Sequence, residues 1–227
     1  TLPSDTYLIN LYDLISKIYL SRKKYKLSLN YAIKRNSIAI NSENNKKFSK
    51  EIVIDTINKY KFFYKTYSMN YDKKNNYGLN HDNLVFLVGF PRSGTTLIDS
   101  ILRSHSNTTV LEEKPYLINI RHKFFSENKL EYIEYITEDE IKKLQNIYFN
   151  SFDYNEKKII IDKFPLNLIE IGFIKKIFPK SKIVLVLRHP LDTILSCVLT
   201  SFKINEAMAN YENLNTSGSN SNKQGKA

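Results

Sequence analysis

The sequence of 227 residues contains one cysteine, Cys197, and no tryptophan. A single cysteine excludes an internal disulfide framework, so the fold must rest on packing, and we expect a cytoplasmic location. One cysteine and four scattered histidines do not make a metal site, so we expect none. We interpret Cys197 as a small core residue.

Long apolar runs are also missing. The longest, such as IVLVL at 183–187, are far shorter than the roughly 20 residues that a membrane-spanning helix needs. We therefore expect no membrane association. The chain begins at Thr1 without a charged and then apolar leader, and we interpret it as a piece of a longer protein.

Basic residues outnumber acidic ones, 34 to 23, which gives a net charge of +11. Such a charge suits an anionic partner, either a nucleic acid, an acidic membrane or a phosphorylated cofactor. No run of five or six basic residues gathers on one segment, so we do not expect a nucleic-acid partner.

Residues 1–69 carry apolar side chains at helical spacing, with breaks expected near 37–47. Within them, IYLSRKKYKLSLNYAIKRNSIAI indicates a helix, a short turn and a second helix that packs through Ser28. This pattern is similar to part of a tetratricopeptide repeat, although any antiparallel helix pair gives it too. Residues 70–83 are polar and indicate a linker, and 211–227 are expected to form a disordered tail.

From residue 84 to 210, predicted strands alternate with predicted helices. The apolar run NLVFLVG is typical of a buried parallel strand, and TEDE begins a helix with Thr137 and Glu140 at capping-box spacing. Further strands are expected at 108–113, 157–162 and 181–188, and further helices at 95–104, 165–178 and 190–202. This order predicts an α/β fold, a P-loop-type parallel sheet flanked by helices and preceded by the helical segment.

The segment GFPRSGTT has two glycines, Gly89 and Gly94, at the spacing of a Walker loop, but Thr95 stands where the lysine belongs. In such loops, backbone N–H groups and a helix N-terminus bind phosphate oxygens. Arg92 supplies a permanent cation inside the loop. The segment therefore predicts a site for a terminal anion without a metal-bridged triphosphate.

The extended segment GFPRSGTTLIDSILRSH resembles the 5′-phosphosulfate loop of sulfotransferases that use 3′-phosphoadenosine 5′-phosphosulfate. The closest resemblance is to tyrosylprotein sulfotransferases and to bacterial sulfotransferases with tetratricopeptide repeats. This resemblance covers residues 84–210. It implies that the 5′-phosphosulfate is bound by Arg92, Ser93, Gly94, Thr95 and Thr96. The family continues for several dozen residues beyond this point, so we interpret the chain as C-terminally truncated.

A second anion site is expected in RHPLDTILS. Arg188 follows a predicted strand, at the sheet edge where open α/β folds bind ligands, and Ser196 lies eight residues further on. The pair matches the 3′-phosphate motif of the resembling family. It implies that Arg188 and Ser196 bind the 3′-phosphate of the cofactor.

Transfer of a sulfuryl group to a hydroxyl needs a base and cations. In the resembling families, a glutamate eight residues after the histidine that follows the first helix fills the first role, and that count from His105 leads to Glu113. Glu112 is the competitor and should point to the opposite face of an alternating strand. Lys163 matches the lysine that the tyrosylprotein enzymes place beside the bridging oxygen.

The resemblance implies transfer from 3′-phosphoadenosine 5′-phosphosulfate to an acceptor hydroxyl, with 3′,5′-adenosine diphosphate as the product. The acceptor stays open among a protein tyrosine, a sugar and a small alcohol, and a protein or peptide partner could bind the helical segment. Two alternatives also stay open. One is a non-catalytic interaction protein with a degenerate core, and the other is a P-loop kinase or NTPase, which the missing lysine disfavours.

Overall fold

The computed structural model describes residues 4–66, 82–124 and 130–214. The expected linker, 70–83, falls almost wholly outside these ranges. The same holds for the part of the expected tail, 211–227, that lies beyond residue 214. Among the described helices, none combines the length and apolarity that crossing a membrane requires.

The chain folds as two compact units. One comprises residues 60–188, and the other comprises 1–59 together with 189–227. Helix α3 (Lys50–Thr66) passes from the second unit into the first. The domain limits expected from the sequence were drawn from changes in composition, whereas these units are defined by contacts between residues. The expected limits stay predictions.

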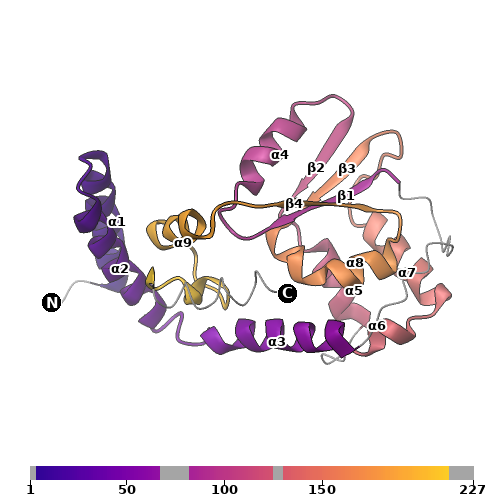
Figure 1. Cartoon of the computed structure of the whole chain (residues 1–227), viewed down its shortest axis with the longest axis horizontal. Coiled ribbons are helices and arrows are strands. Elements are labelled where there is room, and N and C mark those ends of the chain that lie inside the picture. Colours follow the sequence, from indigo (N-terminus) through magenta and orange to yellow (C-terminus); the bar gives the residue numbers. More distant parts are fainter. Residues whose placement is uncertain (1–3, 67–81, 125–129, 215–227) are drawn as a thin grey trace. The chain divides into compact units, whose positions relative to one another are not determined.

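Residues 60–188 form a four-stranded parallel sheet with helices on both faces (Figure 1). The strand order is β2-β3-β1-β4. The bounds are β1 Leu84–Gly89, β2 Thr108–Glu112, β3 Ile159–Lys163 and β4 Lys182–Val186. The predicted α/β fold is confirmed.

The two faces of this sheet are covered differently. Helix α4 (Thr95–Arg103) lies on one face, and helices α5 (Tyr116–Phe124), α7 (Glu138–Phe149) and α8 (Ile171–Ile177) lie on the other (Figure 1). The main apolar core is on the three-helix face, where Phe86 of β1 meets aromatic rings of α7 and of the segment after α8. Burial on both sides explains why β1 is a continuous apolar run.

Adjacent residues of β3 point to opposite faces of the sheet. Asp162 pairs in register with Phe86, and its carboxylate accepts a hydrogen bond from Tyr148 Oη (2.6 Å) in the main core. Lys163 pairs with Leu87 on one side and with Glu112 on the other. Strand alternation therefore sends Lys163 to the face that α4 covers.

Two helix predictions in this unit have different outcomes. The capping box at Thr137 and Glu140 is confirmed, since each side chain accepts from the other's backbone N–H. The single helix predicted at 165–178 is wrong in detail: η1, a 3-10 helix at Pro165–Glu170, precedes α8. Pro165 lacks an N–H, and the tighter turn holds two buried polar residues, Asn167 and Glu170, which amphipathic spacing does not foresee.

The other unit contains a helical hairpin, α1 (Asp5–Ser21) and α2 (Tyr25–Asn41). Small side chains meet at one point of the hairpin, where Ser16 Oγ donates to Ser28 O at 2.9 Å, so the predicted packing at Ser28 is confirmed. The break expected to begin at residue 37 starts later, because α2 continues to Asn41. The similarity to a tetratricopeptide repeat stays a prediction.

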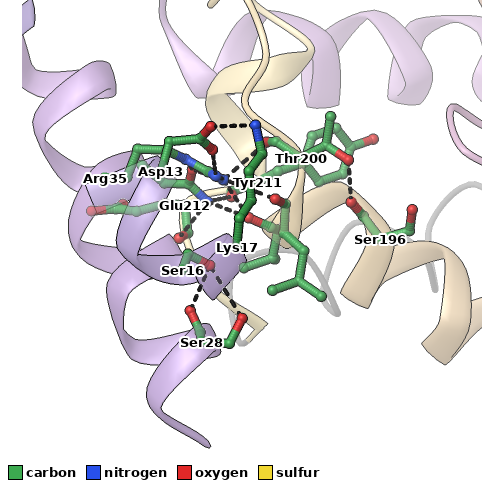
Figure 2. A network of polar contacts seen from close by, with 12 residues as sticks. Asp13, Ser16, Lys17, Ser28, Arg35, Ser196, Thr200, Tyr211 and Glu212 are labelled. Atoms are coloured by element: carbon green, nitrogen blue, oxygen red, sulfur yellow. Dashed lines mark hydrogen bonds and ion pairs between the residues drawn. The ribbon is translucent and has the colours of Figure 1, made fainter. Parts of the chain in front are cut away.

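The same unit contains α9 (Pro190–Leu199), which ends three residues before the predicted limit. Its last carbonyls have no partners within the helix. The buried guanidinium of Arg35 on α2 donates to three of them, Val198 O (2.9 Å), Leu199 O (3.2 Å) and Thr200 O (3.0 Å). Arg35 also pairs with Asp13 of α1 at 2.5 Å (Figure 2). One side chain thus links three helices.

We expect Arg35→Met to destabilise the protein by about 3 kcal/mol. Among the described residues, Asp13 would keep only the exposed Lys17 as a cationic partner, and Leu199 O and Thr200 O would lose the guanidinium that donates to them. Urea unfolding followed by circular dichroism measures this loss. Lys26→Met, which removes an exposed cation from the same helix, is the matched control and should change little. Equal midpoints for the two variants would show that the network does not stabilise the fold.

The buried Asp162 gives this fold a pH dependence. Burial raises its pKa to about 7, and the hydrogen bond from Tyr148 opposes only part of the rise. In the unfolded chain an aspartate titrates near pH 4, at about 3.9. Between these values the folded protein binds more protons than the unfolded chain, so stability should fall as the pH rises through this window.

Wild-type protein should therefore lose about 3 kcal/mol through this group between about pH 5 and pH 8, and Asp162→Asn should lack that loss. Urea unfolding at both pH values tests the difference. Asp153→Asn removes an exposed carboxyl of the same unit and should keep the wild-type pH dependence. An unchanged slope in Asp162→Asn would contradict the assignment.

Candidate active site

The loop after β1 has a backbone that only small residues permit at two positions. A Cβ on Gly89 would lie 2.8 Å from Ser93 Oγ and 2.9 Å from Val186 O, and Gly94 has a φ of +108°. Arg92 also has a left-handed φ, 68°, which is uncommon for a residue with a side chain. The loop is therefore held tightly between the end of β4 and the start of α4.

This loop exposes hydrogen-bond donors at the N-terminus of α4. The cap residue, Gly94, offers no side-chain acceptor to the first N–H groups of the helix. Ser93 is 6% exposed, and its Oγ has no hydrogen-bond partner among the described residues. A buried hydroxyl without a partner is costly, so a ligand oxygen would stabilise the loop.

The remaining predicted loop residues differ in access. The side chains of Arg92 and Thr96 are exposed, whereas Thr95 is buried against the position of Gly89. Thr95 thus contributes packing and its place at the start of α4. Arg92 and Thr96 are accessible to a bound anion.

Arg188 lies beside this loop. It follows β4 at the carboxyl edge of the sheet, and its Nη1 donates to Arg92 O at 3.3 Å. The structure thus brings Arg188 and the loop together. Ser196 lies on α9, in the other compact unit, and its pairing with Arg188 stays a prediction from the sequence.

The two predicted catalytic residues are in direct contact. Lys163 Nζ lies 2.6 Å from Glu113 Oε1. The lysine side chain is only 1% exposed, unlike an ordinary surface lysine, whereas that of Glu113 is 56% exposed. A buried cation therefore contacts a carboxylate that solvent, or a substrate in solution, can reach.

The backbone at Glu113 explains this contact. Its N–H donates to Lys163 O at 2.8 Å, and its φ of 47° turns the chain out of the strand. The expectation that Glu112 and Glu113 point to opposite faces is therefore wrong, because strand alternation ends at Glu112. Glu112 Oε1 also lies near Lys163 Nζ, at 3.8 Å.

Two further charged residues, both on α4, lie beside Lys163 and Glu112. Neither was predicted from the sequence. Asp99 is 2% exposed, and its Oδ2 lies 3.9 Å from Lys163 Nζ. Arg103, one turn later, donates to Asp99 and also to Glu112 Oε2 (3.0 Å). The spacing of four residues on a predicted helix was the available signal for the pair.

Comparison with known proteins identifies the family of this chain. The sequence profile of the sulfotransferase family matches residues 84–223, which include the loop, Glu113, Lys163 and Arg188. An uncharacterized protein of Aquifex aeolicus (strain VF5) is 32% identical over 123 residues, which are 49% of this chain and 16% of that protein. The chain therefore spans a small part of the length of this relative. Because the family profile covers more than half of its residues, the chain belongs to the sulfotransferase family.

Proposed function

We propose that this protein transfers a sulfuryl group from 3′-phosphoadenosine 5′-phosphosulfate to an acceptor hydroxyl. Membership of the sulfotransferase family supports this activity, and the donor, the acceptor and the residue roles are further parts of the proposal. The observation that carries them is the Lys163–Glu113 contact of 2.6 Å at the carboxyl edge of the same sheet as a P-loop without its lysine.

The residues present fit the 5′-phosphosulfate end of this donor. The unpartnered Ser93 hydroxyl and the first N–H groups of α4 are donors for anionic oxygens, and Arg92 adds a cation. Gly94 keeps the backbone open to the anion, with Thr95 and Thr96 at the helix start. When bound, the donor supplies the sulfuryl group and leaves as 3′,5′-adenosine diphosphate.

Two residues have the chemistry that the transfer step needs. Glu113 accepts the proton of the acceptor hydroxyl while the new S–O bond forms and the bond from sulfur to the 5′-phosphate oxygen breaks. Lys163 donates a hydrogen bond toward the departing oxygen, where negative charge develops. The buried ammonium is suited to this role because few water molecules compete with it.

The 3′-phosphate is assigned to Arg188 and Ser196 by their spacing in the sequence. A guanidinium binds two phosphate oxygens at once, and a serine hydroxyl can donate to a third. The contact between Arg188 and Arg92 O supports this proposal, because it lies on the carboxyl side of the sheet with the loop.

The acceptor is proposed only as a hydroxyl compound. The exposure of Glu113 suits an acceptor that arrives from solvent, and a protein tyrosine, a sugar hydroxyl and a small alcohol all meet that condition. A peptide acceptor could use the α1–α2 hairpin as a further contact. The cytoplasmic location stays a prediction.

Titration with 3′,5′-adenosine diphosphate should raise the melting temperature of the protein. Ligand at 100 times its dissociation constant stabilises the folded state by about 2.7 kcal/mol. Arg188→Ala should lose most of this shift, whereas Arg22→Ala, which removes an exposed arginine at the end of α1, should keep it. Stabilisation by magnesium ATP alone would contradict the proposal, and no response to either nucleotide would favour an interaction protein.

Glu113→Gln should lower kcat by roughly 10²–10⁴ because the acceptor loses its base, while the affinity for 3′,5′-adenosine diphosphate should change little. Glu112→Gln is the matched comparison and should lower kcat far less. Transfer of labelled sulfate to tyrosine peptides, sugars and small alcohols measures the rates and identifies the acceptor class. A larger loss in Glu112→Gln would assign the base to Glu112 instead.

A further inference from the structure

Among the described residues, three carboxylates surround the ammonium of Lys163, and one of them is within hydrogen-bond distance. Glu113 Oε1 lies at 2.6 Å, whereas Glu112 Oε1 is at 3.8 Å and Asp99 Oδ2 is at 3.9 Å. Glu112 pairs in register with Lys163 on the neighbouring strand, so it is the nearest competitor of Glu113 for the ammonium. A shift of less than 1 Å would make that contact a hydrogen bond.

Arg103 holds Glu112 in its place. Its Nη2 donates to Glu112 Oε2 at 3.0 Å, whereas the contact of 3.8 Å with Lys163 Nζ is made by the other oxygen, Oε1. Arg103 is itself half exposed and long, so this contact alone would be weak and readily exchanged with water.

Hydrogen bonds to Asp99 fix the position of the Arg103 guanidinium. Both carboxylate oxygens of Asp99 accept from the guanidinium, at 3.0 and 3.1 Å from Nη2, and Oδ1 also accepts from Nε at 3.2 Å. The Asp99 side chain is 3% exposed on the inner side of α4, so it has little freedom to follow Arg103 into solvent. A rigid acceptor that takes several hydrogen bonds from a guanidinium fixes its direction as well as its distance.

We propose that Asp99 and Arg103 form a clasp that keeps Glu112 away from Lys163. The lysine then remains available to Glu113 and to the departing oxygen of the transfer step. Asp99 and Arg103 are thus positioning residues, which act through Glu112. Their effect on rate rests on the proposed function, whereas the position of Glu112 does not.

The kinetic test uses suppression of one substitution by another. Asp99→Asn and Arg103→Gln should each lower kcat about tenfold and leave the KM for the donor within about twofold, since a misplaced cation affects the transfer step most. Adding Glu112→Gln to either variant should restore most of kcat, because the competing carboxylate is gone. Asp99→Glu, which keeps the charge, should retain more activity than Asp99→Asn.

The matched control is Glu138→Gln, which breaks an exposed ion pair with Lys142 at the same helical spacing. It should leave both constants unchanged. Loss of kcat in the Asp99 and Arg103 variants without recovery on adding Glu112→Gln would overturn the clasp, because that result indicates a general structural role.

A crystal structure of Arg103→Gln provides a readout that needs no activity. The clasp predicts that a Glu112 oxygen moves to within about 3.2 Å of Lys163 Nζ. A Glu112 side chain that stays in place, or turns to solvent, would overturn the clasp even if wild-type protein is an active sulfotransferase. Wild-type protein that neither binds 3′,5′-adenosine diphosphate nor transfers sulfate would overturn the proposed function, and the crystal structure would still decide the clasp.

Discussion

The buried ammonium of Lys163 is the constraint on which the site depends. A charged group removed from water is stable only when opposite charges and hydrogen bonds replace its hydration. Here Glu113 supplies the direct contact, while Asp99 and Glu112 supply negative charge slightly further away. The turn at Glu113 and the position of α4 bring carboxylates to this side chain. Arg103 pairs with two of them, Asp99 and Glu112.

The parallel sheet makes that arrangement possible. Because β1 pairs with β3 on one side and with β4 on the other, the carboxyl ends of these strands share one edge of the sheet. The loop after β1, Lys163 at the end of β3, and Arg188 after β4 all lie at that edge. Edges of this kind collect ligand-binding residues in open α/β folds. The strained loop belongs to the same edge, since the glycines at 89 and 94 permit the close approach of Ser93 and the turn into α4.

Two consecutive residues of strand β3 bury charged or polar side chains on opposite faces of the sheet. Asp162 lies in the apolar core, where its raised pKa favours a neutral carboxyl that accepts from Tyr148. Lys163 lies on the other face among carboxylates that match its charge. A reversal of these two residues would put the cation in the apolar core, so their order keeps the site on the α4 side.

Much of this architecture could be read from the sequence. Local patterns determined the α/β class, the loop between Gly89 and Gly94, the capped start of α7 and the pairing of α1 with α2 at Ser28, because each depends on neighbouring residues. Glu113 and Lys163 were identified through a family resemblance. Only the tertiary structure decided that they touch, that Glu112 lies on the same side and that Asp99 and Arg103 join them. Those contacts depend on a left-handed turn and on residues up to 64 positions apart, from Asp99 to Lys163, and neither is encoded in a local pattern.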